Sequence, residues 1–498
     1  MVMQAPWRSE YVTEDSERGV RNARTAAVAD QCARAARESD MSPISRRRFL
    51  LTSSGAVALT TGLSAAAARV NTARVVPGRV SPNERLNIAA IGVGGICRSN
   101  LRACASENIV ALCDVDDVRA AETYQKFPKA KRYRDFRVLL DKEHRNIDAV
   151  IVATPDHTHA VIAMAVMRAG KHLYCQKPLA HSIHEVRTLT ETARETGIQT
   201  QMGNQGHSSN EIRRLREWVQ AGVLGQVREV YAWSDRPVGG DPWSDFPIMA
   251  RPKDTPPVPE TLDWDLWLGP ARERPYHPIY CPTTWRGFWD FGTGALGDMG
   301  CHILDPAFWA LDLGQPETVQ ATTTHWEPEV SEETFPRASI IRYRFPARGE
   351  MPPVTVTWFD GRLKPPIPET FEPGRTLGSN GALLIGDRAT AIHGSHGAGD
   401  LELLPVSQRE SFQEPPETLP RVKDGAHEQD WVRACKDGKP ASSSFDYGGP
   451  LTEMVLIGVL AMRLQDRVLA WDPENLRVAN VEEANALLNP VYREGWSL

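Results

Sequence analysis

Short apolar runs alternate with helical patterns through residues 86–202. Runs rich in Val, Ile, Leu and Ala indicate buried strands, and apolar positions three and four apart between them indicate helices. Such alternation is typical of βαβ units and a parallel sheet. The expected strands are Leu86–Ile91, Ile109–Cys113, Ala149–Thr154, His172–Cys175 and Gln199–Met202, and the expected helices are Asn100–Ala105, Val118–Phe127, Phe136–Lys142, Ala160–Ala169 and Ile183–Thr196.

The pattern changes after Asn210. A helix and a strand precede a stretch rich in Pro and Trp that runs from Pro237 to Trp289. Longer strand candidates follow, which predicts an α+β domain with a largely antiparallel sheet. The expected elements are the helix Glu211–Ala221, the strands Val227–Trp233, Thr318–His325, Ser339–Phe345, Val354–Phe359 and Ala382–Ile385, and helices near 427–435 and 452–464.

Residues 41–68 have the pattern of an export signal. Ser45-Arg46-Arg47-Arg48-Phe49-Leu50 precedes an uncharged stretch that ends in small residues at 65–68, as at a signal-peptide cleavage site. This resembles the twin-arginine signal, whose route carries folded proteins, so we expect export by the twin-arginine translocase to the periplasm or otherwise out of the cytoplasm. The alternative is an ordinary basic stretch before an apolar helix. Because Met41 opens the signal, we hypothesise that residues 1–40 are a gene-model extension, and 69–85 is a linker.

Composition narrows the classes of partner. The chain has 498 residues, enough for two domains, and no later run is long and apolar enough to span a membrane. Its net charge is −6 and it has no basic block, so nucleic acid is not an expected partner. Its eight cysteines include no Cys-x-x-Cys pair, so no metal site is expected.

A glycine-rich loop follows the first strand directly. In Gly92-Val93-Gly94-Gly95-Ile96, Gly92 permits a tight turn and Gly94 lets the backbone approach a pyrophosphate on the next helix's amides. Asp114 lies 22 residues after Gly92, where an acid binds ribose hydroxyls and repels a 2′-phosphate. The alternative is a glycine-rich turn before any helix. The combination predicts a Rossmann domain over 86–205 that binds NAD through Gly92, Gly94, Gly95, Ile96 and Asp114.

Two further segments follow predicted strands. Thr154-Pro155-Asp156-His157 ends one strand, and Lys177-Pro178 follows His172–Cys175. The carboxyl ends of parallel strands face the ligand crevice. We therefore expect Thr154, Pro155, His157 and Lys177 at the cofactor.

A third segment suits proton transfer. Asp298 and His302 are four residues apart, so a helix puts both on one face, and Pro306 should interrupt that helix. A neutral histidine can take the proton of an alcohol. The alternative is a buried histidine satisfied by a helix-capping aspartate.

Together these segments resemble the glucose–fructose oxidoreductase / inositol dehydrogenase (Gfo/Idh/MocA) family over residues 86–490. The resemblance implies an open C-terminal sheet over 206–498, hydride transfer between a sugar or polyol carbon and NAD, and a homo-oligomer. It assigns Lys177 to orienting substrate and cofactor, Asp298 to a substrate hydroxyl and His302 to acid/base catalysis. Gln176 replaces the family's usual acid before Lys-Pro.

The segments 262–270, 276–278 and 285–287 look like the twin-arginine-exported subgroup of that family. Trp285, Arg286 and Trp289 flank the histidine segment and are candidate substrate contacts, although large aromatics also build cores. Asn204 and Gln205 follow another predicted strand end and are candidate contacts too, with an exposed polar turn as the alternative.

Three functions remain open from sequence. The first is an NAD-dependent oxidoreductase acting on a hydroxyl of a sugar, polyol or glycoside, with tightly bound, internally recycled cofactor. The second is an NAD-dependent glycoside hydrolase that oxidises a hydroxyl, eliminates the aglycone, adds water and reduces again. The third is a non-catalytic exported binding protein, against which the coexistence of Lys177, Asp298 and His302 argues.

Overall fold

The computed structural model describes residues 84–324, 327–407, 412–465 and 467–498. The predicted extension 1–40, the export signal 41–68 and nearly all of the linker 69–85 lie outside the described residues. Within the described chain, no helix is long and apolar enough to cross a membrane.

The N-terminal half holds a six-stranded parallel sheet with the strand order β3-β2-β1-β4-β5-β6. Its central strands are almost wholly buried, which explains their continuous apolar runs. The order reverses between β1 and β4, where doubly wound sheets bind their ligands. The strands are β1 (Asn87–Ile91), β2 (Asn108–Cys113), β3 (Lys131–Tyr133), β4 (Ala149–Val152), β5 (His172–Cys175) and β6 (Thr200–Met202).

Five helices connect these strands, and the predicted Rossmann architecture is confirmed. Ser182 and Glu185 form a capping box that starts α6, and Gly197 ends it in a left-handed conformation. α5 begins at Asp156, four residues before the predicted start at Ala160, because its first turn is polar and escapes apolar periodicity. The helices are α2 (Cys97–Ala103), α3 (Asp117–Lys126), α4 (Phe136–Glu143), α5 (Asp156–Arg168) and α6 (Ile183–Thr196).

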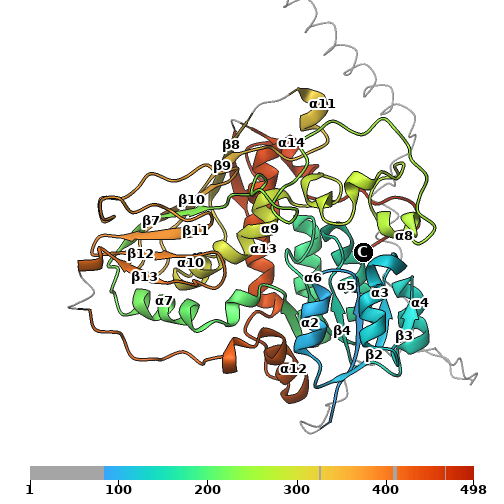
Figure 1. Ribbon diagram of the computed structural model, residues 1–498. Coiled ribbons are helices and arrows are strands. Elements are labelled where there is room, and N and C mark those ends of the chain that lie inside the picture. Colours follow the sequence, from blue (N-terminus) through green and yellow to red (C-terminus); the bar gives the residue numbers. More distant parts are fainter. Residues whose placement is uncertain (1–83, 325–326, 408–411, 466) are drawn as a thin grey trace, which may run out of the picture. The chain divides into compact units, whose positions relative to one another are not determined.

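The C-terminal half is built on a nine-stranded sheet with the order β13-β12-β11-β7-β10-β9-β8-β14-β15, seen on the left of Figure 1. Its pairs are antiparallel except for β7 with β10, as predicted. The short strands β12 to β15 were not predicted. The strands are β7 (Val227–Trp233), β8 (Thr318–Thr323), β9 (Ser339–Phe345), β10 (Val354–Phe359), β11 (Gly381–Gly386), β12 (Thr390–His393), β13 (Glu402–Leu404), β14 (Val468–Asp472) and β15 (Arg477–Val478).

Helices of the C-terminal half pack between and around the two sheets. The predicted interruption near Pro306 is confirmed, because α9 ends at Ile303 and α10 begins at Asp305. The helices are α7 (Asn210–Gln220), α8 (Trp264–Leu268), α9 (Gly294–Ile303), α10 (Asp305–Ala310), α11 (Pro328–Ser331), α12 (His427–Asp437), α13 (Phe445–Arg463) and α14 (Glu482–Asn485), with short 3₁₀ turns at Gln205–Ser208, Pro278–Tyr280, Thr284–Gly287 and Lys423–Gly425.

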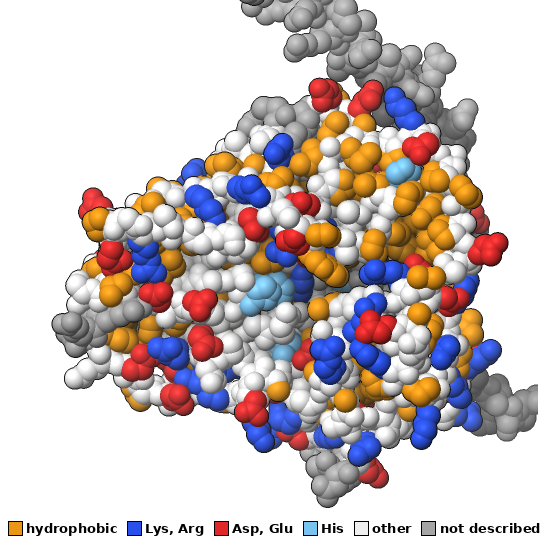
Figure 2. Space-filling view, viewed as in Figure 1, with side chains coloured by type: hydrophobic (Ala, Val, Ile, Leu, Met, Phe, Trp, Pro, Cys, Tyr) orange, Lys and Arg blue, Asp and Glu red, His pale blue; other side chains and the backbone are white. Residues whose placement is uncertain are grey.

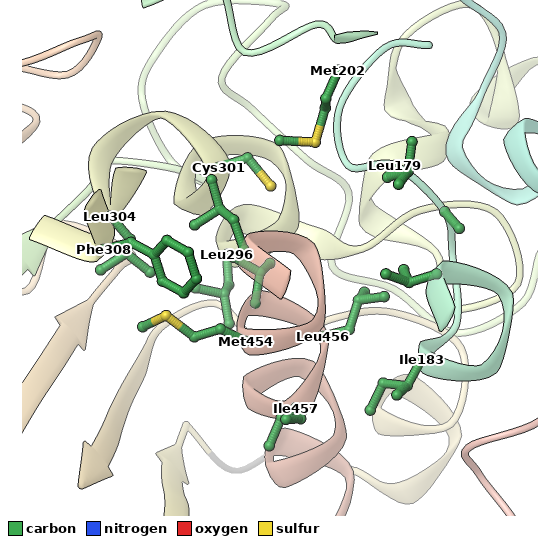
Figure 3. Close-up of a cluster of buried hydrophobic side chains, with 14 of the residues drawn as sticks. Leu179, Ile183, Met202, Leu296, Cys301, Leu304, Phe308, Met454, Leu456 and Ile457 are labelled. Carbon is green, nitrogen blue, oxygen red and sulfur yellow. The ribbon is translucent and has the colours of Figure 1, made fainter. Parts of the chain in front are cut away.

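The long helix α13 joins the two halves. It packs on α6 of the first half and on α9 and β8 of the second. Figure 3 shows Met454 and Ile457 of α13 near Leu296 of α9 and Phe308 of α10, with all four side chains buried. Burying such side chains contributes about 1.5–3 kcal/mol each. This packing sets where α9 stands relative to the parallel sheet.

A second join is made by α12. Its residues Trp431, Val432 and Cys435 pack into the core of the parallel sheet beside Leu101 and Tyr174. In Figure 1, α12 lies next to α2, far along the chain from it. The chain therefore returns to the N-terminal sheet at α12, before it adds β14 and β15 to the second sheet. The proposed division at residues 205 and 206 stays a prediction.

Candidate active site

A pocket of about 340 Å³ runs from the glycine loop after β1 to helix α9. Figure 2 shows histidine and basic side chains gathered at a hollow in the middle of this face. The predicted residues on its lining are Gly92, Gly94, Gly95, Ile96, Asp114, Thr154, Pro155, Lys177, Gln205, Trp285, Arg286, Asp298 and His302. Loops from both halves of the chain thus meet at one cavity.

The glycine loop has the backbone that a nucleotide needs. Gly92 has a φ of +81°, and a Cβ there would lie 2.7 Å from the carbonyl oxygen of Ala153. A Cβ on Gly94 would lie 2.7 Å from Cβ of Arg119, whereas one on Gly95 would meet nothing within 4 Å. Cys97, which stands at the third glycine position of the usual Gly-x-Gly-x-x-Gly dinucleotide loop, is fully buried at the start of α2. Its small side chain allows the close packing of helix on strand that is expected at that position.

Asp114 lies at the end of β2, on the wall of the same pocket. Its carboxylate accepts hydrogen bonds from the amides of Gly94 (2.8 Å) and Asp116 (3.0 Å). Burial nevertheless raises the pKa of Asp114 to about 6, since desolvation outweighs these hydrogen bonds. An acid is thus held next to the glycine loop, where a ribose would lie.

The side chain of Lys177 is hydrogen-bonded to a residue of the C-terminal half and not to its sequence neighbour Gln176. Its Nζ donates to the carbonyl oxygen (2.6 Å) and to Oδ1 (2.9 Å) of Asp298. Gln176 turns away and donates to Oδ1 of Asn100 at 3.1 Å. Asp298 therefore supplies the carboxylate partner that the family resemblance placed at position 176.

Two arginines share the same carboxylate. Nε of Arg236 lies 2.9 Å from Oδ2 of Asp298, and Nε of Arg286 donates to Oδ1 at 3.1 Å. The positive charges of Lys177, Arg286 and Arg236 hold the pKa of Asp298 far below its usual range, although the group is buried. Asp298 is therefore ionised at any working pH.

His302 lies one helical turn beyond Asp298, buried and at the pocket wall. Its Nδ1 has no hydrogen-bond partner among the described residues, so Asp298 does not satisfy it as the structural alternative required. Burial, and then the charge of Lys177, lowers the pKa of His302 well below its ordinary value. A neutral imidazole is the outcome, and a neutral imidazole can accept a proton.

His396 and Arg236 were missed by the sequence analysis. The ring centroid of His396 lies 4.2 Å from that of His302, and burial lowers its pKa too. Its loop sits against Gly206, where a Cβ would be 2.4 Å from the amide nitrogen of Gly397. The segment His393-Gly-Ser-His396-Gly, two histidines among glycines after a strand, was the available signal.

Three predicted site residues lie outside the pocket lining. Both ring nitrogens of His157 are within 3.2 Å of main-chain carbonyls, and burial lowers its pKa to about 3. Asn204 is fully buried and bonds Asp305 and Ser443. Trp289 donates to the carbonyl of Ser331. These three side chains hold the structure around the site.

Two family models match consecutive parts of the chain. The NAD-binding Rossmann fold of the Gfo/Idh/MocA oxidoreductase family matches residues 86–204, and its C-terminal α/β domain matches residues 208–335. Among solved structures, a levoglucosan dehydrogenase in complex with NADH and levoglucosan aligns with a TM-score of 0.52 at 18% identity, over 80% of this chain and 100% of that chain. At this identity the likeness shows the fold alone.

Curated relatives are similar over parts of the chain. A glycosyl hydrolase family 109 protein of Saccharopolyspora erythraea is 34% identical over 349 residues, 66% of this chain and 65% of that protein. Levoglucosan dehydrogenase of Pseudarthrobacter phenanthrenivorans is 24% identical over 257 residues, 49% of this chain and 56% of that protein. Myo-inositol 2-dehydrogenase of Thermotoga maritima is 28% identical over 143 residues, 28% of this chain and 42% of that protein.

The chain thus spans about half the length of the curated relatives it matches. Both family models are consistent with the two sheets and with the pocket between the glycine loop and α9. The chain belongs to the Gfo/Idh/MocA oxidoreductase family, and residues 86–204 are its NAD-binding Rossmann domain.

Proposed function

We propose that the protein is an NAD-dependent oxidoreductase acting on a hydroxyl group of a sugar, polyol or glycoside. The observation that carries this proposal is the unpartnered, buried His302 in the same pocket as the glycine loop and the anchored Lys177. A buried polar atom without a partner costs about 1–3 kcal/mol, and at a pocket wall a bound ligand could supply the partner of His302.

The residues present fit a dinucleotide. The amides of the Gly94–Ile96 turn would face the pyrophosphate, and Asp114 would accept from ribose hydroxyls. Thr154 and Pro155 line the pocket after β4, beside the place expected for the nicotinamide. NAD, when bound, supplies a hydride acceptor.

The protein's own residues handle the proton. His302 would take the proton of the substrate hydroxyl, and NAD, when bound, would accept the hydride from the carbon that becomes the carbonyl. Lys177, fixed by Asp298, is placed to hold the reacting oxygen, because its ammonium can donate a further hydrogen bond. Arg286, Trp285 and Gln205 line the remaining wall and would contact the substrate.

An NAD-dependent glycoside hydrolase is the second candidate. The 34% identity to a glycosyl hydrolase family 109 protein favours it. The same His302 would take part in transient oxidation, followed by elimination of the aglycone, addition of water and reduction. Such a cycle consumes no cofactor and would suit an enzyme outside the cytoplasm. A binding protein without catalysis would have no use for an unpartnered buried histidine at this place.

Turnover tests the oxidoreductase proposal directly. Acid-released nucleotide establishes that purified protein carries NAD, and absorbance of the reduced nicotinamide is followed after adding sugars and polyols. Oxidised sugar with reduced cofactor accumulating supports the dehydrogenase, and aglycone release from aryl glycosides without added NAD supports the hydrolase. Protein without nucleotide, and with neither activity, would contradict both.

Two variants test the residue roles. His302→Ala and Lys177→Ala should lower turnover by about 10²–10⁴-fold while bound NAD is retained, since general acid–base groups contribute on that scale. The exposed His144 gives a matched control, and His144→Ala should keep full turnover. Unchanged turnover in both pocket variants would overturn the assignment.

Cofactor affinity should depend on pH through Asp114. Its pKa of about 6 means that the carboxylate is ionised above pH 6 and protonated below. An ionised carboxylate accepts ribose hydroxyls more strongly, so NAD binding should weaken as the pH falls through about 6. Titration of nucleotide-free protein with NAD checks this, and Asp114→Asn should bind weakly with a flat profile. An equal pH dependence in Asp114→Asn would contradict the assignment.

We further propose export by the twin-arginine route and assembly into a homo-oligomer. Export of a folded domain would let NAD cross already bound, and outside the cytoplasm the cofactor would then be recycled in place. The pattern at 45–50 and the small residues at 65–68 support this proposal. Replacing Arg46 and Arg47 by Lys should leave the precursor in the cytoplasm, as cell fractionation and N-terminal sequencing would reveal. Normal export of that variant would overturn the proposal.

A further inference from the structure

Three basic side chains surround one carboxylate at the α9 end of the pocket. Lys177, Arg236 and Arg286 all pair with Asp298. Their side chains are only 14%, 19% and 20% exposed, and that of Asp298 is 9% exposed. The cluster therefore carries more positive than negative charge in a largely desolvated place.

The carboxylate of Asp298 cannot satisfy all the donors. Its Oδ1 accepts hydrogen bonds from Lys177 and Arg286, and its Oδ2 forms an ion pair with Nε of Arg236 at 2.9 Å. In both arginines the atom paired with Asp298 is Nε, and Nε of Arg236 also donates to the carbonyl oxygen of Trp243 at 3.5 Å. Among the described residues, no hydrogen bond is made by either Nη of Arg236, and only Nη1 of Arg286 has one, to the carbonyl of Thr283. Several guanidinium donors therefore remain free at the pocket wall.

Among the described residues, the pocket lining holds no further acid paired with this cluster, and the exposed Asp241 outside the lining also interacts with the charge of Arg236. Asp156 lines the pocket, but one of its oxygens accepts from Oγ1 of Thr293 at 2.6 Å, and burial raises its pKa. The remaining acids on the lining, Asp114, Asp116 and Asp135, belong to the β2–β3 end of the Rossmann half. Even with Asp156 ionised, three cations face two anions at the α9 end.

Such an arrangement favours an anionic ligand. Three cations that share one carboxylate leave an excess of positive charge in a partly desolvated place, which is costly, and a guanidinium does not escape the cost by losing its proton. Arg286 is further fixed in place, since its guanidinium carbon lies 4.2 Å from the ring centroid of Trp285. The positive field also acts on His302 and His396, whose pKa values Lys177 and Arg236 help to lower. Planar paired donors match a carboxylate.

We propose that the hydroxyl-bearing substrate is a sugar acid, whose carboxylate is bound by Arg236 and Arg286 while His302 takes the proton of the oxidised hydroxyl. This rests on the proposed function of the same pocket. The anionic group would complete the charge balance that Asp298 leaves open. It would also fix which hydroxyl is presented to His302.

Binding and oxidation of matched pairs test the inference separately. The NAD-loaded protein is titrated calorimetrically with D-glucuronate against D-glucose, D-galacturonate against D-galactose, and D-gluconate against sorbitol, with reduction of the bound cofactor followed in parallel. At least one acid should bind about 10–100-fold more tightly than its neutral partner, the range expected for charge-assisted hydrogen bonds. Glucose 6-phosphate serves as a comparison, and tighter binding of it than of every acid would overturn the carboxylate assignment.

Substitutions of the two arginines test whether they cause the preference for the acid over its neutral partner. Arg236→Gln and Arg286→Gln should each reduce the preference for the acid by about tenfold, and Arg286→Lys should keep part of it, because charge remains but paired donation is lost. Arg228→Gln, an exposed arginine on the same strand β7 that precedes Arg236, should keep the full preference. Circular dichroism and NAD content show that each variant is folded. A preference that survives in the folded Arg236→Gln/Arg286→Gln double variant would overturn the inference.

The two proposals fail in different ways. If neutral sugars bind and are oxidised as well as their acids, the oxidoreductase function stands and the sugar-acid inference falls. If an acid binds tightly through the arginines but the cofactor is never reduced, the charge inference stands and the oxidoreductase function falls. If no acid binds more tightly than its neutral partner, the inference falls whatever the enzyme oxidises.

Discussion

The buried carboxylate of Asp298 is the interaction on which the site depends. It joins Lys177, at the end of strand β5, to helix α9 of the second half. It also collects Arg236 from the end of β7 and Arg286 from the turn before α9. Without this anion, three largely buried cations would face one another, at a cost of several kcal/mol. With it, the lysine is held beside His302 in a defined place.

The fold brings these groups together through packing far from the chemistry. Helix α13 packs on α6 and α9 at once, and α12 packs into the core of the parallel sheet. These two contacts set the distance between the glycine loop and α9. The close approach of Gly206 and Gly397 then brings the loop with His396 over His302. The contact between Gly206 and Gly397 thus helps to place His396 beside His302, the candidate acid/base.

The sequence predicted the parts that follow from local patterns. The buried strands of the Rossmann half, the glycine loop and the Asp298–His302 spacing are local signals, and the structure has each of them. Contacts between residues that are far apart in the sequence could not be predicted from such local patterns. Nothing near Arg236 shows that it meets Asp298, and the short strands β12 and β13 that carry the His396 loop have too few residues for a clear periodicity. His157 and Asn204 looked like ligand residues by position, but their side chains turn into buried hydrogen-bond networks.

Gln176 stands where the resembled family usually has an acid, and Asp298 supplies a carboxylate for Lys177 in its place. The side chain of Gln176 bonds Asn100, whereas Lys177 pairs with Asp298 across the pocket. If Asp298 acts by holding Lys177, the two residues are energetically coupled. The most direct measurement is a double-mutant cycle of Asp298→Asn and Lys177→Met on kcat/KM, with NAD content as the control for folding. The account predicts a double variant about as impaired as the worse single variant, with a coupling energy of at least ~1 kcal/mol. Fully additive losses would contradict it.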